Sequence, residues 1–225
     1  MIESFIYALS SEFTPVVSKK YISSDFMPLD LAETNAALID VDVSSSKDME
    51  RYIRHLLDER GAKVAYGGYL EKRAIYSRSH HFNQSNPETE RNIHLGVDLW
   101  CPAGTTIIAP LDGIVHSVQN NDNFGDYGPT IILEHNYNQN SFYTLYGHLS
   151  LSSLQIPIGK KVLKGEEIAI LGDAEVNGDY APHLHFQIIK DLEGRSGDYP
   201  GVCSKKDLEV FKKNCPDPNL LLKIY

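Results

Sequence analysis

A series of short strand-like segments between residues 93 and 190 constrains the fold of this chain more than any other feature. The segments, rich in apolar and β-branched residues, are TTIIAP, GIVHSV, PTIILEH, SFYTLYGH, KVLKGEEIAILG and HLHFQII. The turn-forming sequences PAG, NNDNFGDYG, YNQN and NGDYAP separate them. Strands at such close spacing favour an all-β sandwich or barrel over alternating strands and helices. We therefore expect a mainly β core.

The N-terminal part of the chain has a different pattern. The segment SSSKDMERYIRHLLDERG places apolar residues at helical spacing after a serine cap and stops at Gly61, which predicts a helix. The segment KVAYGGYLEKRAIYS alternates around Gly67 and Gly68, which predicts a hairpin. The polar loop after it contains His80 and His81, which we expect to be solvated loop histidines.

The C-terminal part predicts one more short helix. The segment SKKDLEVFKK begins with a capping box from Ser204 to Asp207, and its helix should end before Pro216 and Pro218. The chain thus divides by pattern into an N-terminal extension of helix and hairpin, a β core, and a C-terminal tail whose helix packs on the core. Their ranges are 1–90, 91–195 and 196–225.

Charge limits the class of partner. The chain of 225 residues has a formal net charge of −9 and a pI near 5.4, and no run of lysine or arginine exceeds two residues. This balance disfavours nucleic acid and anionic membranes as main partners and favours a small, peptidic or neutral one. The start, MIESFIYALS, has neither the basic nor the long apolar region of an export signal, and no segment predicts a transmembrane span. As written, we expect a cytoplasmic protein, with export by a non-standard route or within a larger assembly left open, as is the oligomeric state.

Three cysteines, Cys101, Cys203 and Cys215, are too few for a disulfide framework. We expect buried thiols, with pairing of Cys203 and Cys215 left open for an oxidising compartment.

The histidine pattern indicates a metal site. In a strand, His183 and His185 of PHLHF project from the same face, and so would His94 and Asp98 in an extended IHLGVD. Two neutral imidazoles and one carboxylate suit zinc, and three protein ligands leave the fourth tetrahedral position for water. Spacing alone does not choose the ligands, because His116, His135 and His148 also lie in strand-like segments.

Three motifs in order decide between these histidines. HLGVDLWCPAGT, LYGHLS and PHLHF resemble the H-x-G-x-D, Y-x-H-L and H-x-H motifs of the lysostaphin-type, or LytM-like, zinc metallopeptidases, which are peptidoglycan endopeptidases. The resemblance spans roughly residues 93–189. It implies an antiparallel β-sandwich or barrel-sandwich hybrid with an open groove, whose walls would be the loops 120–128 and 173–182.

The resemblance also implies the roles of single residues. His94, Asp98 and His185 would hold one Zn²⁺. His148 and His183 would be the catalytic pair, with His183 as the base for the zinc-bound water and His148 stabilising the tetrahedral intermediate. The expected activity is hydrolysis of amide bonds in peptides, with peptidoglycan stem peptides or cross-bridges as the expected substrates. We expect His135 to be a packing residue, and His116 receives no role.

Some relatives of this family have a preceding segment that supplies an extra zinc ligand, often asparagine. Asn35, Asn83 and Asn92 are available for this, and the sequence selects none of them. Whether residues 1–90 occlude the groove therefore stays open.

Other classes of protein share part of the pattern. The glucose-specific enzyme IIA of the sugar phosphotransferase system, a phosphocarrier, has a segment similar to IHLGVD but no H-x-H partner. Non-catalytic regulators of cell-wall hydrolases normally have substitutions at the motif positions, and this chain has none. A biotinyl or lipoyl carrier, suggested by VLKGEEIAILGD, would need an M-K-M or D-K-A hairpin that is absent.

Overall fold

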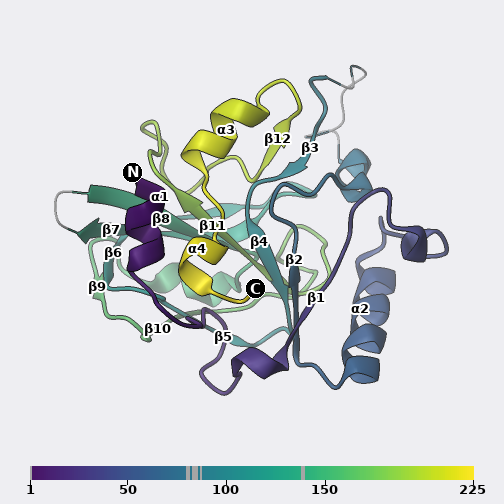
Figure 1. Cartoon of the computed structure of the whole chain (residues 1–225), viewed down its shortest axis with the longest axis horizontal. Helices are drawn as coiled ribbons and strands as arrows, with labels where there is room; N and C mark the ends of the chain where they lie inside the picture. Colours follow the sequence, from purple (N-terminus) through teal and green to yellow (C-terminus); the bar gives the residue numbers. More distant parts are fainter. Residues whose placement is uncertain (1, 80–81, 83–85, 87, 138–139) are drawn as a thin grey trace.

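The computed structural model describes residues 2–79, 82, 86, 88–137 and 140–225 (Figure 1). His80, His81 and Asn83 lie outside the described residues, so the predictions about them stay predictions.

The fold is built on one eight-stranded sheet. Its order is β1-β2-β4-β11-β8-β7-β6-β9, and all neighbours are antiparallel except β1 and β2. The strands are β1 (Phe26–Pro28), β2 (Val64–Gly67), β4 (Val97–Trp100), β6 (Gly113–Asn121), β7 (Gly128–Tyr137), β8 (Asn140–Gly147), β9 (Lys161–Val162) and β11 (His183–Ile189). Two further pairs are β5 (Thr106–Ile108) with β10 (Glu167–Ile170), and β3 (Arg91–His94) with β12 (Val202–Ser204). The prediction of a mainly β, mostly antiparallel fold is confirmed, and every predicted strand segment contains a strand.

The helices lie outside the sheet. They are α1 (Ile2–Ala8), α2 (Ser46–Arg60), α3 (Leu208–Asn214) and α4 (Asn219–Leu222), with 3₁₀ turns η1 (Ser23–Asp25), η2 (Ala36–Leu38), η3 (Ala74–Arg78) and η4 (Leu151–Gln155). The predicted helix α2 is confirmed with its caps, because the Ser45 hydroxyl accepts from the amide of Asp48 and Gly61 ends the helix at φ +64°. The helix predicted before Pro216 is α3, which ends at Asn214. No helix among the described residues is long and apolar enough to span a membrane.

The predicted hairpin around Gly67 and Gly68 is wrong. Strand β2 pairs with β1 and β4, which come from distant parts of the chain. After Gly68 the backbone turns toward β3 instead of returning along β2: the Leu70 amide donates to the carbonyl of His94, and the Arg73 amide donates to that of Asn92. The alternating pattern identified one strand correctly, but long-range pairing determined its partners.

The central strand β11 separates two chemical environments. All seven of its residues are buried. Leu184, Phe186 and Ile188 belong to the largest apolar cluster, which also contains Val16, Val17, Leu221 and Leu222 from the two ends of the chain. The intervening residues, His183, His185 and Gln187, project from the opposite face. The strand therefore presents a row of polar groups inside an otherwise apolar interior.

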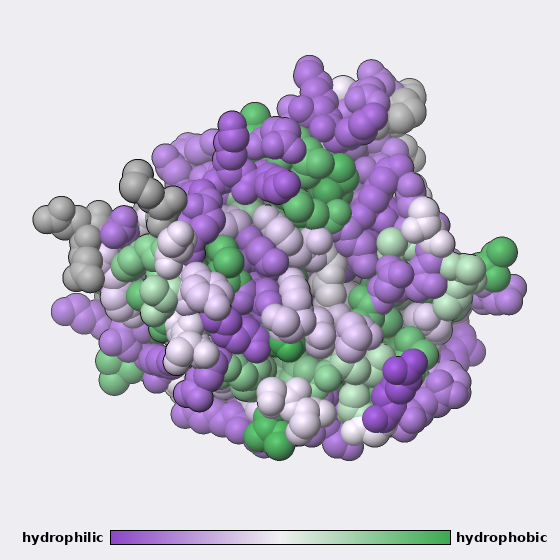
Figure 2. All heavy atoms as spheres, in the orientation of Figure 1, coloured by the Kyte–Doolittle hydropathy of each residue, from purple (hydrophilic) through white to green (hydrophobic). Residues whose placement is uncertain are grey.

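All three cysteines are buried free thiols, as predicted. The Sγ of Cys215 accepts a hydrogen bond from Nε2 of Gln187 at 3.2 Å. The surface is mainly polar on the side shown in Figure 2, with apolar residues in separate patches.

Candidate active site

His94 and Asp98 converge because the chain bends between them. We expected one extended strand, but His94 ends β3 and Asp98 lies in β4, and these strands belong to different sheets. The bend contains Gly96, where a Cβ would lie 2.7 Å from Nε2 of His185, so only glycine leaves room for that ring. The result is a distance of 3.3 Å between His94 Nε2 and Asp98 Oδ1.

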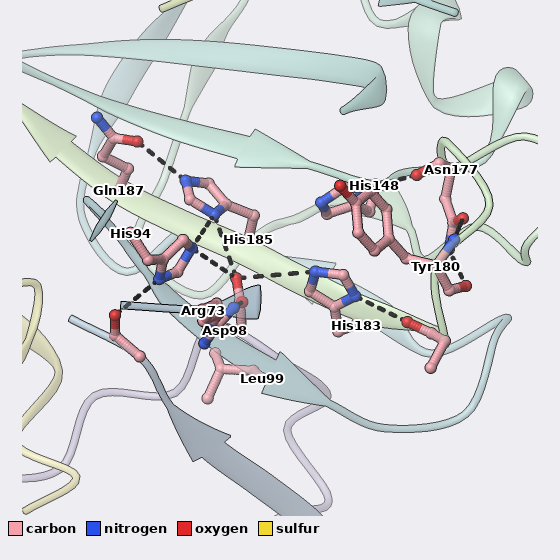
Figure 3. Close-up of polar contacts among 12 residues, drawn as sticks. Arg73, His94, Asp98, Leu99, His148, Asn177, Tyr180, His183, His185 and Gln187 are labelled. Carbon is pink, nitrogen blue, oxygen red and sulfur yellow. Dashed lines mark hydrogen bonds and ion pairs between the residues drawn. The ribbon is translucent and has the colours of Figure 1, made fainter. Parts of the chain in front are cut away.

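Strand β11 brings the third predicted ligand to the same point. His185 lies opposite Asp98 in the antiparallel register of β11 and β4. Its Nδ1 is 3.1 Å from Asp98 Oδ1 and 2.8 Å from His94 Nε2 (Figure 3). Within the described part of the chain, these three side chains form the group whose donor atoms could hold a metal ion.

The geometry of this group suits a tetrahedral metal ion. Bonds of zinc to nitrogen and oxygen of 2.0 to 2.1 Å place neighbouring donor atoms about 3.3 Å apart. The three observed separations are 2.8, 3.1 and 3.3 Å. Two of these separations are shorter than the ideal one, so small side-chain movements that widen the group would accommodate the ion.

Each ligand imidazole has its protonation site determined by an outer neighbour. Nδ1 of His94 donates to the carbonyl of Gly68 at 2.9 Å, and Nε2 of His185 donates to Oε1 of Gln187 at 2.9 Å. The amide of Gln187 is itself oriented, because its Nε2 donates to the carbonyl of Pro200. The opposite ring nitrogens of His94 and His185 thus face each other and the carboxylate. An arrangement in which three acceptor atoms face one another is electrostatically favourable only when a cation lies between them.

The predicted catalytic pair lies beside this group. Nδ1 of His183 donates to the carbonyl of Ala181 at 2.7 Å, and Nδ1 of His148 donates to the carbonyl of Asn177 at 2.8 Å. The two ring centroids are 4.2 Å apart, and Nε2 of His183 is 3.8 Å from Asp98 Oδ1. Both Nε2 atoms are therefore available to a reacting group near the carboxylate.

The backbone at His148 is unusual. This residue follows β8 and has φ +63°, in the left-handed region that non-glycine residues avoid. The conformation is held by two hydrogen bonds, from the His148 amide to the carbonyl of Tyr127 and from the Gly172 amide to the carbonyl of His148. Strain held in this way at a site is typical of functional residues.

Burial determines the charge states in the site. It lowers the pKa of His94 to about 4 in spite of the nearby Asp98, and it holds the pKa of His148 well below the ordinary value, with His183 adding to the effect. Burial alone would raise the pKa of Asp98, but the facing histidines and Arg73 hold it well below its usual value. Neutral imidazoles and an ionised carboxylate are the states that bind a cation.

Sequence reasoning missed two residues that contact the predicted ligands. Gln187 orients His185, and it could have been found, because it continues the alternation of His183 and His185 on the same face. Arg73 contacts Asp98, with Nη1 donating to Oδ2 at 2.5 Å. It belongs to no motif, and only the tertiary structure brings it to the site.

The remaining candidates lie elsewhere. His135 is buried, with Nδ1 2.8 Å from the carbonyl oxygen of Asp112 and Nε2 2.7 Å from the hydroxyl of Thr144, so it packs as predicted. His116 contacts the Ser117 hydroxyl. Neither Asn35, which caps η2, nor Asn92, whose amide donates to Glu90, belongs to the group of metal-ligand candidates.

The pocket over the site has four walls, one of which consists of Arg195, Asp198, Tyr199, Pro200, Gly201 and Val202. Loop 120–128 contributes Gly125, Asp126 and Tyr127, and loop 173–182 contributes Tyr180 and Ala181, as predicted. The third wall comes from the N-terminal part of the chain and consists of Leu31, Met49, Arg73, Ile75, Tyr76 and Phe82.

Comparison with known proteins identifies the family. Residues 92–198 match Peptidase family M23. These residues form a peptidase M23 domain. The M23 domain contains all five predicted site residues, whereas Gly68 and Arg73 precede it.

Curated relatives of the M23 domain are metalloproteases and an endolysin. An uncharacterized metalloprotease of Haemophilus influenzae is 35% identical over 128 residues, which cover 56% of this chain and 25% of the relative. Endolysin 2638A of Staphylococcus phage 2638A is 26% identical over 162 residues, covering 69% of this chain and 32% of the endolysin. The chain thus spans a quarter to a third of the length of these relatives.

Solved structures with similarity to the M23 domain include two peptidases. A zinc-containing peptidase from Vibrio cholerae is 29% identical, with a TM-score of 0.37 and coverage of 48% of this chain and 30% of that chain. The catalytic domain of lysostaphin from Staphylococcus simulans is 24% identical, with a TM-score of 0.38 and coverage of 54% and 80%. The family and the names of the curated relatives support a hydrolase of the metallopeptidase class.

Proposed function

We propose that the chain is a zinc-dependent endopeptidase that hydrolyses amide bonds in peptides, with peptidoglycan stem peptides or cross-bridges as substrates. The convergence of three potential metal-ligand atoms, from His94, Asp98 and His185, carries this proposal. The endolysin among the curated relatives supports a cell-wall peptide as the substrate.

The five site residues have distinct proposed roles. His94, Asp98 and His185 would hold one zinc ion, which when bound supplies a Lewis acid and lowers the pKa of water in its open position. Nε2 of His183 accepts the proton of the attacking water, because its Nδ1 proton is held by the carbonyl of Ala181. His148, whose ring centroid lies 4.2 Å from that of His183 and whose Nδ1 is engaged by the carbonyl of Asn177, would stabilise the tetrahedral intermediate from its Nε2 side.

Burial of these groups suits their roles. The proposed ligands are 1, 1 and 2% exposed, whereas His148 and His183 are each 5% exposed. The rings of Trp100 and Tyr180 contact His183 and His148, so the catalytic pair works in a largely apolar, water-poor enclosure.

Incubation of the zinc-loaded protein with purified peptidoglycan and a panel of free muropeptides tests the proposal. Mass spectrometry should detect new peptide ends, and elemental analysis should find one zinc per chain. The His183→Ala variant should retain zinc and lose turnover by at least 100-fold. His116→Ala, a histidine substitution outside the pocket, should leave the zinc content and the turnover unchanged. Absence of cleavage of every substrate by the zinc-loaded protein would contradict the proposed peptidoglycan activity.

The geometry argues against the phosphocarrier alternative. Nε2 of His94, the nitrogen free to accept a phosphoryl group, is 3.3 Å from the Asp98 carboxylate, which would repel that group. A non-catalytic regulator would keep its effect on a partner enzyme in the His183→Ala variant, so the same variant separates that class from an enzyme.

A further inference from the structure

Arg73 is a buried cation at the edge of the proposed metal centre. It lies between β2 and η3, outside the M23 domain, and only 4% of it is exposed. A buried charge is costly unless it is paired and hydrogen-bonded. Its Nε donates to Oε2 of Glu71 at 2.5 Å and its Nη1 to Oδ2 of Asp98 at 2.5 Å, and its guanidinium lies over the ring of Trp100.

The two oxygens of Asp98 have different partners. Oδ2 accepts from Arg73, whereas Oδ1 lies 3.1 and 3.3 Å from the facing nitrogens of His185 and His94 (Figure 3). Rotation of the carboxylate would exchange these oxygens only by breaking the charge-assisted hydrogen bond to Arg73. One oxygen is therefore held toward the imidazoles.

We propose that Arg73 is a positioning residue that fixes the Asp98 carboxylate for single-oxygen coordination of the metal ion. The N-terminal part of the chain thereby completes a metal centre whose ligands all belong to the M23 domain. This inference rests on the proposed metal site and assigns a function to a residue outside the family motifs.

Glu71 offsets the positive charge of Arg73 at this position. An unpaired guanidinium beside Asp98 would repel an incoming dication. Glu71 pairs with the same guanidinium and is itself held, because its Oε1 accepts from the Leu31 amide at 2.9 Å. The charge of Arg73 is thus balanced by a carboxylate that does not face the metal site. The contribution of Arg73 is therefore the hydrogen bond that sets the orientation of the Asp98 carboxylate.

The fork of the guanidinium is required for this arrangement. Nε and Nη1 reach two carboxylates at once in a fixed planar geometry, which a lysine ammonium on a flexible stem does not reproduce. Gly68 leaves room for the same group, because a Cβ there would collide with Nη2 of Arg73.

Zinc affinity tests the inference directly. Competition with a chromophoric chelator should give a zinc Kd that is 10 to 100-fold weaker for Arg73→Met, the range found for outer partners of metal ligands. Arg73→Lys keeps the charge and loses the fork, so its Kd should also weaken, by at least 5-fold. Lys72→Met is the matched control: it removes the same charge one residue away, from an exposed side chain paired with Glu33, and should bind zinc as the wild type does.

A second readout separates positioning from a general structural effect. Cobalt(II) in place of zinc reports ligand geometry through its visible absorption bands, which should change in both Arg73 variants. A merely structural role would lower the melting temperature of the metal-free protein and leave the zinc Kd and the cobalt spectrum as in the wild type.

The outcomes are distinguishable from failure of the proposed function. A wild-type protein without zinc affinity would remove the metal centre itself, and this inference with it. Zinc affinity within 3-fold of wild type in Arg73→Met would overturn the inference alone. If Arg73→Met does not fold, zinc affinity within 3-fold of wild type in Arg73→Lys would overturn the inference.

Discussion

At the scale of single residues, the site depends on which nitrogen of each ring carries the proton. In all four histidines of the site, one ring nitrogen donates to an outer acceptor: the carbonyls of Gly68, Asn177 and Ala181 or the amide oxygen of Gln187. The other nitrogen faces the common space. The arrangement is therefore ready for a metal ion and a reacting water before either binds.

Gln187→Leu should weaken zinc binding. The variant removes the acceptor for Nε2 of His185, so the ring is free to change tautomer and orientation, and we expect a loss of about 10 to 100-fold in affinity. Competition with a chromophoric chelator measures the zinc Kd. Gln119→Leu, on the exposed end of β6, is the control, and equal Kd values for the two variants would show that Gln187 does not orient the ligand.

The burial of His135, away from the metal site, predicts that the stability of the fold depends on pH. Burial lowers its pKa to about 4, below the value near 6.5 expected in the unfolded chain. Between these values the unfolded state binds more protons, so stability falls as the pH decreases from about 6.5 to 4, by about 3 kcal/mol for this group. Urea unfolding of the metal-free protein at pH 7 and pH 4.5 should show a smaller loss in His135→Gln than in the wild type. An identical loss in both would contradict this assignment.

At the scale of elements, β11 serves the core and the site together. One face of the strand gives Leu184, Phe186 and Ile188 to the main apolar cluster, and the other gives His183, His185 and Gln187 to the site. The alternation of side chains along this strand thus places the proposed base, His183, a proposed ligand, His185, and the residue that orients the ligand, Gln187, on one face. Packing of the apolar face therefore determines where the chemistry lies.

Phe186→Ala should destabilise the fold strongly. The side chain is fully buried and its ring contacts that of Tyr146, so truncation should lower the free energy of unfolding by about 3 to 5 kcal/mol. Urea unfolding measures the change. Ile158→Ala, at a side chain that is 65% exposed, should cost less than about 0.5 kcal/mol. Similar losses in the two variants would mean that β11 is not the centre of the core.

At the scale of the whole molecule, the N-terminal part is structurally continuous with the M23 domain. Strands β1 and β2 extend the main sheet from β4, and α1 packs beside α4 near the two ends of the chain (Figure 1). We propose that the ranges 1–90, 91–195 and 196–225, although distinct in sequence pattern, form one cooperative unit.

Deletion of residues 1–90 should therefore abolish cooperative folding. The truncated chain would lack β2, one of the two neighbours of β4, as well as the carbonyl that orients His94, and Arg73. We expect an aggregating product without a sigmoidal urea transition. A truncated protein that unfolds cooperatively and binds zinc with wild-type affinity would contradict the single unit.

Removal of zinc should lower the stability of the intact chain. An ion that binds only the folded state adds its binding free energy to folding, which amounts to about 4 kcal/mol when its free concentration is 1,000 times the Kd. Thermal melting with and without a chelator should show the decrease. An unchanged melting temperature would mean that the site holds no metal.

Sequence patterns were sufficient where the physical signal is local. Strand positions follow from alternation and turn residues, α2 follows from its caps and spacing, and the five site residues follow from three motifs in order. The hairpin at Gly67 failed because alternation predicts a strand but not its partner. The single-strand argument placed His94 and Asp98 side by side, and they do lie side by side, but the bend at Gly96 brings them together instead of one extended strand.

The sequence by itself determined which chemical groups this protein has available: two imidazoles and a carboxylate for a cation, and two further rings for proton transfer. Only the tertiary structure decided how those groups are oriented, because the partners that do it, Gly68, Arg73 and Gln187, belong to no motif that names them. Orientation comes from hydrogen bonds between residues far apart in the chain. Such contacts exist only after the sheet has formed, so Gly68 and Arg73 leave no periodic signal in the order of the amino acids, although Gln187 does continue the alternation of His183 and His185.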